Sequence, residues 1–134
     1  MPFVTPIVAG LLALLYLFLS VRVIRLRGQE RISLSDAGNA EMQRRIRVHG
    51  NFAEYTPFAL VLLLLLELQG APWWYLAVLG LMLLAGRSLH AYGVSQNPEP
   101  LQLRIAGMAM TFAVLALGGL SCIILALMNR PVLT

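Results

Sequence analysis

RVHGNFAEYTPFALVLLLLLEL, residues 47–68, joins a polar stretch to a long apolar one. The apolar part, from about Phe52 to Leu68, contains five consecutive leucines. Its length is close to the roughly 20 residues that a helix needs to cross the hydrocarbon core. In the polar part, Arg47, Asn51 and Glu54 recur at steps of four and three residues, which return to one side of a helix. The segment therefore predicts a membrane helix with a polar stripe at one end.

Three further apolar runs have a similar length. They cover Val4–Ile24, Pro72 to about Tyr92, and about Leu103–Met128. The first is followed, not preceded, by positive charges, which favours a retained helix over a signal peptide. The chain is therefore predicted to be all-α, an integral membrane four-helix bundle forming a single domain over residues 1–134. The helices are expected at about 4–27, 40–69, 72–93 and 102–129.

Composition supports this class of protein. The 134 residues are 59% hydrophobic and 12% charged, against about 25% charged in an ordinary soluble domain. A soluble enzyme, a disordered tail and a nucleic-acid binder are disfavoured together, so no nucleic-acid partner is expected. Cys122 is the single cysteine, which excludes an internal disulfide, and two distant histidines predict no metal site.

The basic residues are distributed unevenly. All ten are arginines and the formal net charge is +4. By the positive-inside rule, the first and third connections are predicted to be cytoplasmic and both termini to lie outside. Seven arginines flank the first connection, two flank the third, and one lies on the other side: Arg22, Arg25, Arg27, Arg31, Arg44, Arg45 and Arg47; Arg87 and Arg104; and Arg130.

Ionisable groups inside membrane spans are costly and are candidates for function. Arg44, Arg47, Asn51 and Glu54 fall within an arc of about 80° at ~100° per residue, and Tyr55 lies at its edge. One interpretation is structural, with these residues pairing or holding helices together. The other is a ligand site, because nine arginines near the connections face only five acids. That surplus of forked donors suits a carboxylate-bearing or otherwise anionic ligand. The five acids are Glu30, Asp36, Glu41, Glu54 and Glu99.

The third and fourth helices add three more candidates. Arg87 and His90 are three residues apart and share a face, and Arg104 follows Pro100 at the start of the fourth run. Arg104 is either an anchor whose head reaches the headgroups or a cation at the mouth of the bundle. In the second case it would stabilise a thiolate, because a thiol with a pKa near ~8.5 ionises more readily beside positive charge.

The segment RVHGNFAEYTP, residues 47–57, resembles the signature of the MAPEG family, the membrane-associated proteins in eicosanoid and glutathione metabolism. That signature has an Arg, an Asn four residues later, a Glu three after that, an aromatic residue and a Pro. Residues 86–90, GRSLH, resemble the third-helix motif of the prostaglandin E synthase branch. Residues 102–104, QLR, resemble the start of the fourth helix in the leukotriene synthase branch. The short chain without lysine is typical of a bacterial member.

The resemblance implies a homotrimer in the inner membrane, with glutathione as co-substrate bound between subunits near the cytoplasmic face. Arg104 matches the position proposed to activate the thiol. Val94 stands where the family often has a Tyr, so assistance from a Tyr stays open. Residues at family positions or in the cationic cluster are predicted to hold glutathione: Arg47, Asn51, Glu54, Tyr55, His90, Arg27, Arg44 and Arg87.

The sequence is compatible with three functions. The first is a glutathione-dependent membrane transferase or peroxidase that attacks a lipophilic electrophile reaching the site from membrane lipid. The electrophile, and the choice between transferase, peroxidase and isomerase, stay open. The second is a non-catalytic binder of lipid or glutathione with the same fold. The third, a small multidrug exporter, is disfavoured because residues 4–21 contain no carboxylate.

Overall fold

The computed structural model describes residues 1–129 as four long helices, and Arg130, predicted to lie on the outer side, falls outside this range. They are α1 (Val4–Glu30), α2 (Ala40–Leu68), α3 (Trp73–Ser95) and α4 (Leu101–Met128). All four are long and apolar enough to cross a membrane, which confirms the predicted all-α, four-helix class. The largest difference from the expected bounds is at the end of α1, which continues to Glu30.

Local sequence explains where the helices begin. Asn39 caps α2, and its side-chain oxygen accepts a hydrogen bond from the Met42 backbone N–H at 3.0 Å. Pro72 and Pro100 precede the first residues of α3 and α4, positions where the missing proline N–H costs nothing. Gly70 adopts a positive φ of 83° in the short turn before α3, a conformation that glycine enters without a steric penalty.

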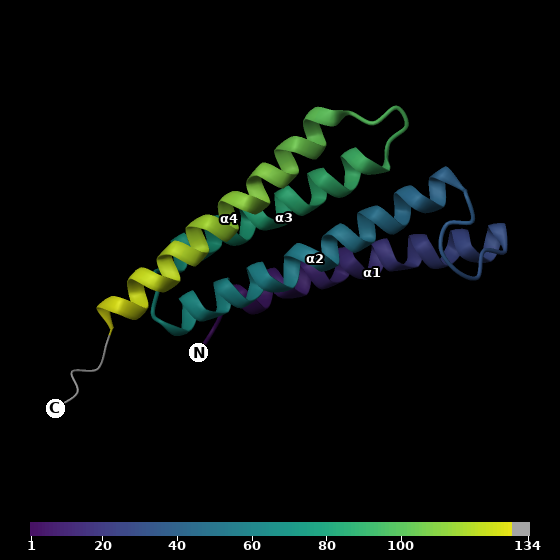
Figure 1. Ribbon diagram of the computed structural model, residues 1–134. Helices are drawn as coiled ribbons and strands as arrows, with labels where there is room; N and C mark the ends of the chain where they lie inside the picture. The colour runs from purple at the N-terminus through teal and green to yellow at the C-terminus, as the bar shows by residue number, and fades with distance from the viewer. Residues whose placement is uncertain (130–134) are drawn as a thin grey trace.

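The helices form two pairs, α1 with α2 and α3 with α4 (Figure 1). Within residues 1–129, α2 and α3 pack against every other helix, whereas α1 and α4 do not pack against each other. The α1–α2 and α3–α4 connections lie at the same end of the bundle, here called the connection end. The other end, where residues 69–72 join α2 to α3, is called the turn end.

Apolar side chains cover the outside as well as the core. Leu63, Leu66, Leu79 and Leu83 are buried between helices, while many large apolar residues on all four helices are exposed. Lipid rather than water must surround such a surface, because an apolar coat of this extent would associate in water. Among the described residues, buried Arg87, His90 and Thr111 cluster between α3, α4 and α2, nearer the connection end than the turn end.

Candidate anion-binding cavity

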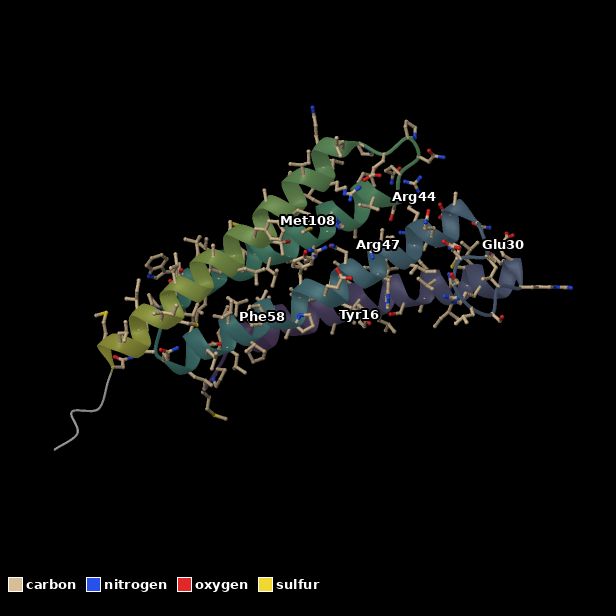
Figure 2. All side chains as sticks on the ribbon, in the orientation of Figure 1. Tyr16, Glu30, Arg44, Arg47, Phe58 and Met108 are labelled. Atoms are coloured by element: carbon tan, nitrogen blue, oxygen red, sulfur yellow. The ribbon has the colours of Figure 1, made fainter. Side chains whose placement is uncertain are left out.

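A cavity of about 290 Å³ opens between α2 and the α3–α4 pair at the connection end. It is lined by five of the predicted site residues, Arg44, Arg47, Asn51, His90 and Arg104, which come from three helices. Arg44 and Arg47 lie on the side of α2 that faces the other pair (Figure 2). Residues up to 64 positions apart thus meet in one site.

The spacing along α2 explains which side chains reach the cavity. Arg44, Arg47 and Asn51 fall on one side of the helix, as steps of three and four residues require. His49 points toward α1 instead, where its ring stacks on Tyr16 with centroids 4.7 Å apart. The His49 Nε2 also lies 3.1 Å from the Ser20 hydroxyl. The side of α2 that carries His49 therefore packs against α1, and the side that carries Arg44, Arg47 and Asn51 lines the cavity.

Arg87 does not line this cavity, although the sequence suggested that it contacts the ligand. Its side chain is fully buried, and its Nη2 donates to Asn51 Oδ1 at 2.6 Å. Its Nη1 donates to the Thr111 hydroxyl at 3.3 Å. The rings of Phe52 and Tyr55 lie 5.9 Å from its guanidinium carbon, a distance typical of cation–π contact.

The Arg87 contact fixes the orientation of Asn51. A guanidinium only donates hydrogen bonds, so the Asn51 carbonyl oxygen must face Arg87. The Asn51 amide N–H groups are then left for a partner in the cavity that Asn51 lines. Within residues 1–129, no carboxylate pairs with Arg87. Its buried charge therefore adds to the positive potential behind the cavity.

Two glycines allow α3 and α4 to form a single wall. A Cβ on Gly107 would stand 2.6 Å from both the Gly86 carbonyl oxygen and the His90 backbone nitrogen, closer than packed atoms can approach. Small residues of this kind let membrane helices approach closely. The close contact brings buried His90 on α3 to the same wall as Arg104 on α4. The His90 Nδ1 has no hydrogen-bond partner within the described chain.

The rim holds more positive than negative charge. Arg104 donates to the Glu99 carboxylate at 3.2 Å, and Arg44 lies 3.9 Å from the other Glu99 oxygen. Arg44 also donates to the carbonyl oxygens of Val94 and Gln96. For the part of the chain that the structure describes, Arg47 has no ion pair or side-chain hydrogen bond. The Glu99 carboxylate thus contacts two of the three arginines that line the cavity, which leaves guanidinium donors for an anion.

Three other predicted site residues lie outside the cavity lining. Glu54 is exposed on α2, and Tyr55 packs against Phe112 with ring centroids 5.6 Å apart. Arg27 donates to the Ser35 carbonyl oxygen at 3.1 Å, beside the first connection. A single chain does not bring these residues into the cavity, and their roles stay predictions.

Sequence reasoning missed Gln43, which lines the cavity. Its position four residues before Arg47 places it on the same stripe, so the spacing itself contained the signal. Glu99 was recognised only as an acid near the arginines. Its contact with Arg104 depends on how the α3–α4 connection folds, and helix periodicity carries no information on that.

Four helices long and apolar enough to span a membrane, with an arginine-rich cavity at one end, define a small polytopic membrane protein. The family model described as "MAPEG family" matches residues 5–124, and the chain therefore belongs to the MAPEG family. It is also similar to "Inner membrane protein YecN" of Escherichia coli strain K12 and of Escherichia coli O6:H1. Each is 42% identical over 114 residues, which cover 85% of this chain and 86% of the relative.

Proposed function

We propose that this protein is a glutathione-dependent transferase or peroxidase embedded as a multi-pass protein in a bacterial inner membrane. The observation that carries the proposal is the donor-rich cavity, where Arg44, Arg47, Arg104 and the Asn51 amide converge. Glutathione has two carboxylates and a thiol, and forked guanidinium donors bind carboxylates with two parallel hydrogen bonds. Membership of the MAPEG family and the similarity to inner membrane proteins support the same proposal.

Each cavity residue has a distinct part in this proposal. Arg44 and Arg47 bind the carboxylates of glutathione, and Asn51 donates from the amide that Arg87 orients. Arg104 stands at the mouth, with its side chain 51% exposed, where its charge favours the ionised sulfur. A ligand anion there takes the place of Glu99 on Arg104. His90 provides a further polar contact on the α3 wall.

The transferase reaction needs little from the protein beyond binding and ionisation. The thiol gives its proton to water, and the thiolate attacks an electrophilic carbon. A carbon–sulfur bond forms while the bond to the leaving group breaks, and the electron pair departs with that group. The electrophile is lipophilic and enters from the surrounding lipid. Our proposal includes a homotrimer in which Glu54, Tyr55 and Arg27 complete the site between neighbouring chains.

The first test is glutathione binding and conjugation by the purified protein in detergent micelles. Calorimetry follows binding, and conjugation of a chloronitrobenzene follows activity. Loss of one charge-assisted contact in Arg47→Ala raises the Kd for glutathione about tenfold or more. Arg25→Ala is the matched control because Arg25 is an exposed arginine outside the cavity, and it leaves the Kd unchanged. A wild-type protein that gives no heat with glutathione contradicts the proposal.

A second candidate is a binding protein that holds glutathione or lipid without turnover. The cavity lining favours it at one point, because Val94 contributes an apolar side chain where the family often has a Tyr. The same experiment separates the two candidates. Binding of glutathione sensitive to Arg47→Ala, with no conjugation of any electrophile tested, supports the binding protein and excludes the enzyme.

A further inference from the structure

A second groove lies between α1 and α3 and shares no lining residue with the arginine-rich cavity. Its volume is about 300 Å³. Leu15, Leu19 and Arg22 line it from α1, and Ala91, Tyr92 and Ser95 line it from α3. None of these residues has a part in the proposed glutathione reaction.

The groove is polar toward the connection end and mostly apolar away from it, where Ser88 adds a hydroxyl to the lining. Arg22 and Ser95 lie near the connection end, where α3 finishes. Leu15 precedes Arg22 by seven residues on the same helix, so it lies about 10 Å further from the connection end along the α1 axis at ~1.5 Å per residue. Ala91, one turn before Ser95, lies on the same deeper side. The groove therefore has a cationic region toward the connection end and a mostly apolar region toward the middle of the helices.

Arg22 is held across the helices and turned into the groove. Its Nη1 donates to the Ser95 hydroxyl at 2.8 Å, and that hydroxyl donates to the Ala91 carbonyl oxygen at 2.6 Å. The Arg22 guanidinium carbon lies 5.9 Å from the Phe18 ring. These contacts differ from those of Arg25, one turn further along α1, which is exposed. An arginine that merely reached for bulk headgroups would resemble Arg25.

The positive charge of Arg22 has no internal counter-ion. Across residues 1–129, no carboxylate lies within ion-pair distance of it. The nearby carboxylate of Glu41 pairs with Arg45 at 2.7 Å, and Arg45 Nη1 donates to the Arg22 carbonyl oxygen at 2.9 Å. A second cation beside Arg22 increases the need for an anion. A guanidinium has five N–H donors, and Ser95 accepts from only one nitrogen of Arg22.

We propose that this groove binds one anionic phospholipid from the membrane leaflet at the connection end. The phosphate lies on Arg22 beside the Ser95 hydroxyl, and an acyl chain follows Leu19 and Leu15 toward the membrane centre. A small soluble anion would leave the apolar half of the groove unused. A zwitterionic lipid adds a positive headgroup next to Arg22 and Arg45. Basic pockets between membrane helices recognise acidic headgroups in this way.

The experiment uses the full-length protein reconstituted in vesicles of phosphatidylglycerol and phosphatidylcholine with identical chains in equal amounts. Native mass spectrometry after gentle detergent release measures the lipid retained per chain. The expected result is one retained phosphatidylglycerol in preference to phosphatidylcholine. Arg22→Gln reduces that preference about fivefold, the effect of removing one basic residue near an anionic surface. Arg25→Gln is the matched control and leaves the preference unchanged.

Arg22→Lys separates charge recognition from a purely structural part for Arg22. Lysine keeps the charge but not the forked geometry, so it retains a preference for phosphatidylglycerol above that of Arg22→Gln. Equal loss in the Lys and Gln variants, or equal loss in Arg25→Gln, overturns the proposal. A wild-type assembly that keeps its subunits but retains no phosphatidylglycerol also overturns the proposal, because the groove would then hold no lipid. None of these readouts involves glutathione.

Discussion

The two ends of the bundle differ in whether their polar side chains find hydrogen-bond partners within the chain. At the turn end, the Glu67 carboxylate accepts hydrogen bonds from the backbone N–H groups of Phe3, Val4 and Thr5 at 2.6, 2.7 and 2.8 Å. Nearby, the Tyr75 and Ser121 hydroxyls pair at 2.7 Å. At the connection end, by contrast, arginine donors outnumber the carboxylates that face them.

The contrast separates polar groups whose hydrogen bonds are satisfied within the fold from polar groups that keep unsatisfied donors. The first four N–H groups of a helix lack helical partners, and Glu67 satisfies three of them at the positive end of the α1 dipole. The charge of Glu67 therefore stabilises the start of α1. The arginines at the connection end retain unsatisfied donors beside a cavity. Unsatisfied hydrogen-bond donors are available to a ligand, whereas donors that already have a partner are not.

The largest effect is expected for Arg104→Ala at the connection end. If Arg104 stabilises the thiolate, its loss slows conjugation by about 100- to 1,000-fold, the usual result of removing one group that stabilises a developing anion. The Kd for glutathione changes far less, because Arg44 and Arg47 still bind the carboxylates. Steady-state kinetics and the ultraviolet absorbance of the bound thiolate measure the two effects. Conjugation at the wild-type rate would show that Arg104 is only an interfacial anchor.

Asn51→Asp sharpens the same contrast because it should separate binding from stability. An aspartate at this position pairs with buried Arg87, which contacts only neutral groups among residues 1–129. The melting temperature in detergent is therefore maintained or raised. Glutathione loses an N–H donor and meets a carboxylate, so its Kd rises about ten- to hundredfold. An unchanged Kd would mean that the Asn51 amide does not face the ligand.

The fold was predictable from the sequence to the extent that apolar length and periodicity determine it. Four runs of near-spanning length gave four helices, and the spacing of Arg44, Arg47 and Asn51 gave the face of α2 that lines the cavity. The MAPEG resemblance is confirmed by the match over residues 5–124. The trimer, the orientation in the membrane and the bound tripeptide stay predictions.

What the sequence could not give depends on contacts between distant helices. Arg87 and His90 share a helical face, yet Arg87 lies behind Asn51 and His90 lines the cavity. Periodicity places both residues on one side of α3 but does not tell which neighbour each one meets. Glu67 was not recognised at all, because its partners lie 62 to 64 residues earlier in the chain. A carboxylate at the end of an apolar run carries no local sign of such a contact.

Glu67→Gln tests the other side of the contrast and should have the smallest effect. Glutamine keeps one oxygen acceptor for the α1 backbone but loses the charge that favours the helix N-terminus. The free energy of unfolding in detergent should fall by about 1 kcal/mol, measured by thermal melting, while conjugation per folded molecule stays at the wild-type rate. Glu30→Gln is the matched control, an exposed acid at the far end of α1, and should leave both values unchanged. A Glu67→Gln protein that melts normally but no longer conjugates glutathione would contradict this contrast between the two ends. The charge of Glu67 would then contribute to the reaction rather than to stability.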